Sequence, residues 1–393
     1  MGPLGNLLSR RDALGTFAAA TAGLLFHPAA SIDERCGSAT WGELAGTLPL
    51  SRPDGVVQSF GVKQGGPGLD ARQVTDLSAL QPDRLVTPNR LACIRTEAPP
   101  VPPRLDQWTI TIAGDAGDLG GLTIAGLTRR AKPMGAHLLE CSGNNNPANF
   151  GLMSVCEYDG VPLADVVARL RPSGAAWGAV VSGMDPTAPS TGSVAGAGWA
   201  FPLAALAQLG AFLALRMNGA PLPLDHGAPI RLVVPGWYGC SWIKWVNQIR
   251  LVPMTDGATS QMREFAGRTH QTRAHALARD YAPAEIDAAA TAVRVEKRRG
   301  GTSGLEYRVV GIVWGGRKPI DQLAIRFGPN DAWRSFPVCP APKTHRTWSL
   351  WEYRWKPTAP AIYDIALKVP DPQIPQRRLD SGYYVRQVRI DEI

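Results

Sequence analysis

The alternation of apolar and polar positions predicts a first region of mixed strands and helices. The segments WTITIAG and GLTIAGL alternate apolar with small or polar residues, as half-buried strands do. Two others, GVPLADVVARL and WAFPLAALAQLG, place apolar residues at helical spacing, and the second is expected to end at Gly210. This mixture favours an α+β domain, to which we assign residues 71–265.

Three further segments of this region predict strands that end in turns. HLLECSGNNN, residues 137–146, is expected to be a strand that runs into a polar loop. APIRLVVPGWYG predicts a buried strand that breaks at Pro235 and Gly236, and SWIKWVNQIRLV predicts a strand that pairs back on it.

The pattern changes after about Met254, where it becomes polar and helical or irregular until about Ala290. We place the joint between two domains there. The remaining chain, from residue 280 to 393, shows short strand patterns separated by turn signals: LEYRVVGIVWGG, IDQLAIRFG, TWSLWEYRW, AIYDIALKV and YYVRQVRI. This spacing predicts an Ig-like antiparallel β-sandwich.

Composition agrees with a soluble two-domain protein. The 393 residues are 45% hydrophobic and 19% charged, and the formal net charge is +8. The charges are dispersed, and the densest run, residues 296–299, is short and contains an acid. Nucleic-acid binding, which needs a basic stripe with interleaved aromatic residues, is therefore disfavoured.

The first 30 residues resemble a twin-arginine export signal. Arg10 and Arg11 precede the apolar stretch from Gly15 to Phe26, which is shorter than the roughly 20 residues that span a bilayer. An amphipathic or core helix is the alternative. Because this export route carries folded proteins, often with a bound cofactor, we expect a periplasmic protein with a prosthetic group and no membrane anchor.

The six cysteines are widely spaced, and the sequence contains no C-x-x-C. Zinc ribbons, iron–sulfur runs and attached c-type haem are therefore unsupported. An oxidising compartment permits disulfides, but the sequence does not pair these residues. One cysteine stands out, because Cys141 lies where a strand meets the loop Ser142-Gly143-Asn144. Such a thiol is either a soft-metal ligand or a buried structural residue before a turn.

The surrounding motifs resemble the sulfite oxidase family. The family supplies a thiolate to molybdenum from a strand-to-loop C-x-G-N, which matches Cys141 to Asn144. MNGAPLPLDHGAPIRLVVPGWYGCSWIKWVNQIRLV resembles its most specific signature, and TPNRLACIRTEAPPVP and TWSLWEYRW resemble two others. The resemblance covers roughly residues 80–393 and implies a sulfite-oxidase-type molybdopterin domain followed by a dimerisation domain.

The resemblance assigns a cofactor-binding set. It implies that Cys141 ligates molybdenum and that pterin dithiolene and oxo groups complete the metal's ligands. The other residues that it implies for the molybdopterin cofactor are Asn144, Asp185, His226, Arg231, Ser241 and Lys244. Simpler roles remain open for several of them: turn residues for His226 and Asp185, and a turn cap for Asn144.

The residues expected to bind sulfite depart from the family pattern. Arg95 keeps the first arginine, but Glu97 replaces a histidine, and Asn146 and Ser349 stand where two further arginines are expected. The usual tyrosine is absent. Phe265 or Arg268 occupies its position, and Arg268 is our candidate for restoring charge, with Arg354 a second possibility.

These departures favour the branch of the family that contains bacterial sulfite and sulfur dehydrogenases. The resemblance implies oxo transfer between molybdenum and a sulfur oxyanion or carrier-bound sulfur. It also implies electron transfer to a c-type cytochrome and a homodimer. Two alternatives stay open: a molybdenum-dependent reductase of sulfoxides or other oxyanions, and a non-catalytic exported interaction protein.

Overall fold

The computed structural model describes residues 36, 40–54, 71–96, 104–114, 117–144, 150–170, 174, 176–184, 197–271, 275–300, 304–381 and 383–393. Residues Thr40–Ile393 form one compact unit that holds the described helices and strands. The predicted export signal, residues 1–30, lies outside the described residues.

The strands of the first domain form two larger sheets and one small one. They are β3 (Ala71–Gln73), β4 (Ile94–Thr96), β5 (Thr109–Gly114), β6 (Gly117–Thr123), β7 (Lys132–Glu140), β8 (Met153–Pro162), β9 (Ala176–Gly183), β10 (Gly198–Pro202), β11 (Phe212–Met217), β12 (Ala220–Pro221), β13 (Arg231–Val233) and β14 (Val246–Pro253). One sheet has the order β10-β9-β14-β5-β6, with β14 parallel to β5. The other has the order β12-β11-β8-β7, with β13 added beside β11. Strands β3 and β4 pair with each other.

Short helices connect these strands and have identifiable ends. They are α1 (Ile124–Thr128), α2 (Leu163–Arg169), α3 (Leu206–Leu209) and α4 (Ser260–Glu264). The side chains of Thr123 and Thr259 accept hydrogen bonds from backbone N–H groups in the first turns of α1 and α4. Gly210, at φ 65°, ends α3 in the left-handed conformation that glycine favours, as the sequence predicted.

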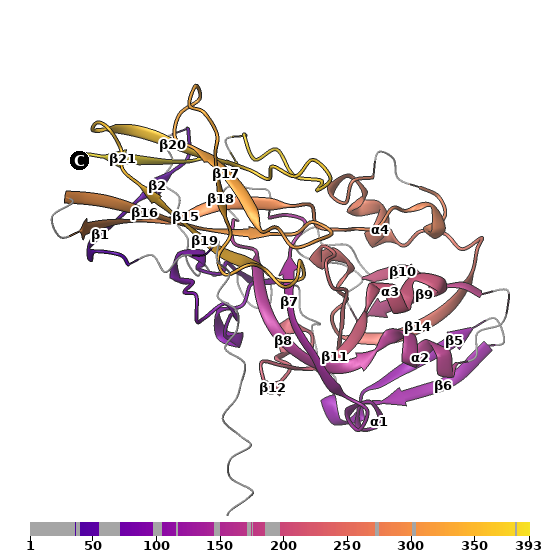
Figure 1. Cartoon of the computed structure of the whole chain (residues 1–393). Helices are drawn as coiled ribbons and strands as arrows, with labels where there is room; N and C mark the ends of the chain where they lie inside the picture. The colour runs from indigo at the N-terminus through magenta and orange to yellow at the C-terminus, as the bar shows by residue number, and fades with distance from the viewer. Residues whose placement is uncertain are drawn as a thin grey trace, which may run out of the picture. The chain divides into compact units, whose positions relative to one another are not determined.

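The second domain is an antiparallel β-sandwich. Its strands are β1 (Glu43–Leu48), β2 (Leu50–Ser51), β15 (Ala289–Gly300), β16 (Gly304–Trp314), β17 (Gln322–Arg326), β18 (Arg334–Pro337), β19 (Ser349–Trp355), β20 (Ala361–Lys368) and β21 (Arg386–Ile390). They form sheets of order β1-β15-β16-β19 and β18-β17-β20-β21-β2 (Figure 1). The predicted fold class, an α+β domain followed by an antiparallel sandwich, is confirmed.

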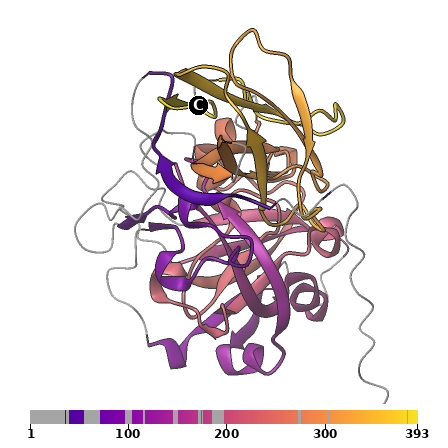
Figure 2. The same cartoon turned by 60° about the vertical axis from the view of Figure 1, so that its left-hand side comes forward.

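Two strands of the sandwich come from the beginning of the described chain. Strand β1 pairs with β15, and β2 pairs with β21. Figure 2 shows β1, in indigo, running beside the later strands. Residues 43–51 therefore complete both sheets of a domain whose other strands begin at Ala289, a role that the sequence pattern did not indicate.

One prediction about local structure was wrong, and another was right only in part. Residues 199–202 were expected to be helical, but they belong to β10, which pairs with β9 and is buried along most of its length. Residues 241–252 were expected to pair back on the strand at Arg231. Their first part does so, through the Ile243 carbonyl and the Val246 N–H, but β14 lies between β9 and β5. The chain turns away at Gly236 (φ 79°) and again at Trp245 (φ 49°), which carries β14 to the other sheet.

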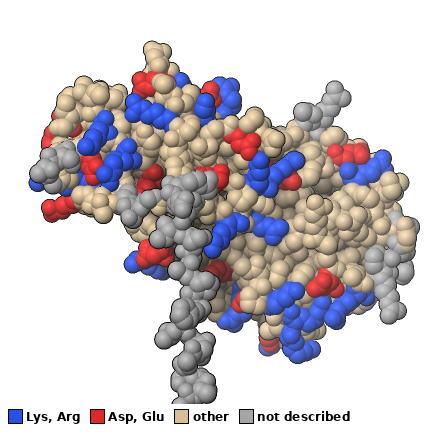
Figure 3. Space-filling view, in the orientation of Figure 1, with Lys and Arg blue, Asp and Glu red and all other residues tan. Residues whose placement is uncertain are grey.

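The described helices include none that is both long and apolar enough to cross a membrane. Lys and Arg are spread over the face in Figure 3, with Asp and Glu between them. This dispersal matches the pattern of charges along the chain.

The core of the sandwich is packed so closely at Gly311 that a larger side chain does not fit there. A methyl group at Gly311, on β16, would collide with the Trp351 ring and the Thr291 carbonyl. Gly311→Ala should therefore lower the free energy of unfolding by about 1–3 kcal/mol, measured by urea denaturation. Gly46→Ala, on β1, is the matched control because its added methyl group meets no atom within 4 Å. Equal stabilities for the two variants would contradict this account of the core.

Candidate functional site

Cys141 lies directly after the last residue of β7, in a tight turn. Its backbone N–H donates to the Leu152 carbonyl (2.9 Å), and the N–H of Asn144 donates to the Cys141 carbonyl (2.8 Å). The N–H of Gly143 points at the Cys141 sulfur, 3.4 Å away. Among the free cysteines of the described residues, Cys141 is partly exposed, whereas Cys93, Cys156 and Cys240 are buried. Cys141 is therefore the described free cysteine that reaches the surface as a residue, while its sulfur is enclosed by the turn.

Asn144 holds this loop together from inside. Its side-chain oxygen accepts the N–H groups of Gly151 (2.9 Å) and Leu152 (3.1 Å). Its amide nitrogen donates to Glu140 Oε1 (3.0 Å). The side chain is 2% exposed, so its polar groups serve the loop itself. The structure thus favours the turn-cap role for Asn144 over direct contact with a cofactor. Asn145 and Asn146 lie outside the described residues.

Glu140, the residue before Cys141, is a fully buried carboxylate with partners from the sandwich. Arg377 donates to both carboxylate oxygens, at 2.8 and 2.7 Å, and the Trp314 indole N–H donates at 2.8 Å. Glu140 raises the pKa of the Arg377 guanidinium, although burial lowers it. The sequence pattern was not used to predict the ion pair between Glu140 and Arg377. Glu140 is a charged residue on the apolar face of a strand, two residues after buried Leu138. A charge in such a position requires a buried partner, and this was the available signal.

Two arginines lie within electrostatic range of Cys141. Burial raises the pKa of the Cys141 thiol, and the Gly143 N–H, Arg95 and Arg268 lower it. Arg95 comes from β4, and Arg268 ends the short 3-10 helix Ala266–Arg268. The guanidinium of Arg268 lies 5.4 Å from the centre of the Phe265 ring, which fills the other candidate position for the family's tyrosine. Of the three residues predicted to be catalytic, Arg95 and Arg268 thus lie close enough to Cys141 to lower the pKa of its thiol.

A second group of side chains forms a buried cationic cluster. Arg231 on β13 is 4% exposed, its guanidinium packs over the Trp242 ring, and its Nε has no hydrogen-bond partner among the described residues. His226 is 5% exposed, and its Nε2 also has no partner there. Burial lowers the pKa of His226 to about 4, with Arg231 and Lys244 acting in the same direction, so the ring is neutral at pH 7. An orphaned arginine N–H in a protein interior indicates a missing anionic partner.

Backbone geometry brings these residues close together. Gly227, at φ 107°, packs so tightly that an added Cβ would lie 2.9 Å from Lys244 Cβ and 3.1 Å from Arg231 Cβ. Lys244 Nζ donates to the carbonyls of Asp225 and Arg95, each at 3.2 Å, and lies over the Trp245 ring. The hydrogen bond from Lys244 to the Arg95 carbonyl connects this cluster to β4, the strand that carries Arg95.

The structure describes some of the remaining predicted site residues and not others. Ser241 is fully buried, and its hydroxyl donates to the Tyr238 carbonyl (2.8 Å), so its proton already has an acceptor. Asp185 and Glu97 lie outside the described residues. Arg354 belongs to a different network, because it pairs with Glu306 (3.4 Å) and packs over Trp41 in the sandwich.

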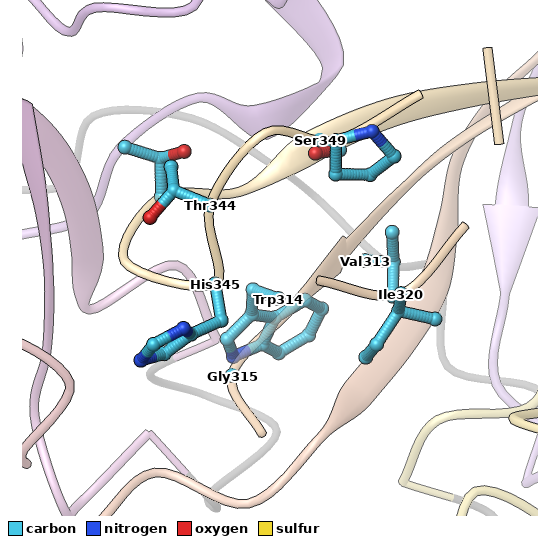
Figure 4. A pocket seen from close by; sticks show the side chains of 9 residues that line it. Val313, Trp314, Gly315, Ile320, Thr344, His345 and Ser349 are labelled. Atoms are coloured by element: carbon cyan, nitrogen blue, oxygen red, sulfur yellow. The ribbon is translucent and has the colours of Figure 1, made fainter. Parts of the chain in front are cut away.

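Ser349 lies where the family pattern led us to expect an arginine. It lines a cavity of about 10 Å³, room for about one water molecule, together with Val313, Trp314, Gly315, Ile320, Pro342, Thr344, His345 and Thr347 (Figure 4). This small void belongs to the sandwich, and no arginine is among its lining residues.

Comparisons with known proteins define the class. Residues 98–259 match the model of the oxidoreductase molybdopterin binding domain. The chain is 26% identical over 289 residues to the mitochondrial sulfite oxidase of Macaca fascicularis, covering 69% of this chain and 53% of that protein. It is 25% identical to the sulfite oxidase of Gallus gallus, covering 84% of this chain and 77% of that protein. The chain thus spans about half the length of the first of these relatives.

A solved structure shows the same fold. The sulfane dehydrogenase SoxCD from Paracoccus pantotrophus superposes with a TM-score of 0.62 at 18% identity, covering 85% of this chain and 91% of that one. The matching domain and the similarity to sulfite oxidases support the sulfite oxidase family for this chain and, with it, a cofactor of molybdenum bound by molybdopterin. The residues fit such a group, since the chain offers the Cys141 thiol and a buried arginine, Arg231, whose Nε has no hydrogen-bond partner in the described protein.

Buried histidines predict a loss of stability in acid. Burial lowers the pKa of His137, on β7, from 6.5 to about 4, whereas the unfolded chain keeps about 6.5. Between these values the unfolded state binds the proton more readily, so the free energy of unfolding falls as the pH decreases from 6.5 to 4. His137→Gln should reduce that fall by about 3 kcal/mol, measured by urea denaturation at stepped pH. An unchanged pH slope in the variant would refute this assignment.

Proposed function

We propose that this protein is an exported molybdenum-dependent oxidoreductase that oxidises a sulfur-type substrate and passes electrons to an external c-type cytochrome. The observation that carries the proposal is the Cys141 thiol, held in the turn after β7 on a partly exposed residue, with Arg95 and Arg268 close enough to lower its pKa. Lys244 Nζ donates to the Arg95 carbonyl, which connects this thiol's surroundings to the buried cations. A metal-binding thiol, cofactor-binding cations and substrate-binding cations are the three components that such an enzyme needs.

Each residue of the site has a physical role in this proposal. The cofactor, when bound, supplies two-electron oxo transfer at sulfur. Cys141 supplies the protein thiolate, because a bound metal deprotonates a thiol whose pKa burial has raised. Arg231 is suited to bidentate contact with a phosphate and Lys244 to a point-charge contact. In the neutral ring of His226 one nitrogen bonds the Asn89 backbone, so the unpartnered Nε2 offers the pterin a hydrogen-bond acceptor without adding charge.

The charges near Cys141 favour a substrate with less charge than free sulfite. Arg95 and Arg268 both lower the pKa of the thiol. Ser349 contributes no charge, and Arg354 is paired with Glu306. Each charge-assisted contact is worth about 1.5–3 kcal/mol, so a site with fewer cations binds a doubly charged anion less tightly. We therefore favour a singly charged sulfur oxyanion or carrier-bound sulfur, which agrees with the name of the solved relative, a sulfane dehydrogenase.

Export and electron transfer complete the proposal. Cys339 is disulfide-bonded, and disulfides persist in oxidising compartments such as the periplasm. The chain has no C-x-x-C-H haem motif, so we assign reoxidation to a separate c-type cytochrome. The sandwich resembles the dimerisation domain of the family, from which we propose a homodimer.

Cofactor content tests this proposal most directly. Protein made in a host that synthesises molybdopterin should contain near-stoichiometric molybdenum and pterin. Cys141→Ser should lose the thiolate-to-metal absorption bands, because the harder serine oxygen replaces the sulfur from which these transitions arise. Arg231→Met should weaken retention of the pterin by about 10- to 100-fold, the equivalent of one lost charge-assisted contact. The measurements are metal analysis, pterin fluorescence after extraction, and absorption spectra.

Cys156→Ser is the matched control, since this buried thiol on β8 contacts the Thr87 carbonyl and a hydroxyl preserves that bond. It should keep wild-type metal and spectrum. Wild-type protein without molybdenum or pterin would overturn the proposed function. Turnover with reduced dyes and a sulfoxide, and none with a sulfur donor and cytochrome c, would instead establish a reductase.

Substrate charge gives a separate prediction at Arg268. Because this side chain is exposed, Arg268→Gln should lower kcat/KM for an anionic sulfur donor by up to about 5-fold at low salt, mainly through KM. High salt should remove the difference. Arg263→Gln, an exposed arginine on α4, is the control and should match the wild type. An equal fall at high salt would show that Arg268 does not act through charge.

A further inference from the structure

The C-terminal segment of residues 377–386, here called the clasp, contacts both ends of the Cys141 loop. At the first end, Arg377 donates to both oxygens of Glu140 and also to the Tyr384 hydroxyl (3.0 Å). At the second end, the Tyr383 hydroxyl donates to the Asn144 carbonyl. The clasp belongs to the sandwich, 237 residues further along the chain than Glu140.

The clasp also contacts Phe150, which follows the loop. The Tyr383 ring lies edge-on to Phe150, with 5.6 Å between ring centres. The Arg386 guanidinium lies 5.0 Å from the centre of the same Phe150 ring. Phe150 immediately precedes Gly151, whose N–H bonds to Asn144. The residues before and after the turn are thus held by one segment of the other domain.

We propose that Glu140, Arg377 and Tyr383 are positioning residues for the Cys141 thiolate, so that the sandwich domain sets the geometry of the metal ligand. The inference rests on the proposed function in taking Cys141 as that ligand. Glu140 is the last residue of β7, and its side chain is fixed by four hydrogen bonds: two from Arg377 and one each from Trp314 and Asn144. Fixing Glu140 fixes the direction in which the next residue leaves the strand.

Two considerations favour positioning over simple stabilisation. A buried ion pair contributes little net stability, because desolvating both charges offsets their attraction, and an apolar pair of similar volume serves as well. Its bidentate geometry, however, restricts orientation far more than apolar packing does. Groups outside the ligand set that orient a metal ligand typically change metal affinity by about 10- to 100-fold when they are removed.

The test uses the full-length protein with two readouts besides activity. Tyr383→Phe removes the hydroxyl that bonds to Asn144 and keeps the aromatic ring, so it is the mildest change. Arg377→Lys keeps the charge but loses the bidentate bond to Glu140. In both variants, hydrogen exchange at the amides of Asn144, Gly151 and Leu152 should become about 10-fold faster. The g values of the molybdenum(V) signal should shift, and the cofactor should dissociate about 10-fold faster.

Arg378→Gln is the matched control, because Arg378 lies within the clasp but is exposed and pairs with Asp380. It should keep wild-type exchange, g values and cofactor retention. Molybdenum-loaded Arg377→Lys and Tyr383→Phe proteins with wild-type exchange and g values would overturn the positioning role, even if they melt at a lower temperature. Wild-type protein without molybdenum would overturn the proposed function instead, and the exchange data would still decide whether the clasp holds the loop.

Discussion

The ion pair between Glu140 and Arg377 is the interaction on which the arrangement of the site depends. Both groups are buried, and each satisfies the other through two hydrogen bonds. Removing one partner would leave an uncompensated charge in the interior, at a cost of about 3–5 kcal/mol. Because Glu140 ends β7 and Arg377 belongs to the sandwich, the pair joins the two domains beside Cys141. This junction helps to explain why residues 40–393 form one compact unit.

The cationic cluster differs from this pair in its hydrogen-bond partners. Arg377 and Arg231 each keep a buried Nε that bonds no described residue, but Arg377 also holds the Glu140 carboxylate through two hydrogen bonds. Burying a cation such as Arg231 costs free energy that the apolar packing around it must offset. The strained backbone at Trp245 (φ 49°), beside Lys244, adds a further cost of about 1–3 kcal/mol. Unfavourable contributions to the folding free energy at one cluster are expected where the binding of a ligand offsets them.

Local structure could be predicted from the sequence, whereas contacts between residues far apart in the chain could not. The turn at Cys141 and the stop at Gly210 follow from residue types that favour those conformations. The Glu140–Arg377 bond joins residues 237 positions apart, and no local preference encodes it. The pairing of β14 was also missed, because its apolar pattern suits any buried strand position. For Asn144 the sequence left cap and ligand open, and only the bonds to Gly151 and Leu152 favour the cap.

The cofactor-binding residues and the residues proposed to bind the substrate differ in burial, and this difference affects the specificity of the site. The cluster around Arg231 and Lys244 keeps the residues that the family pattern assigns to the cofactor, and burial keeps their electrostatic contacts strong. The substrate side instead combines Arg95, which is partly exposed, with Arg268, which is exposed. Exposed charges are screened by salt and discriminate weakly between anions. Under the proposed function, recognition of the substrate would therefore depend on contacts beyond charge, as a sulfur atom carried on a larger partner would provide.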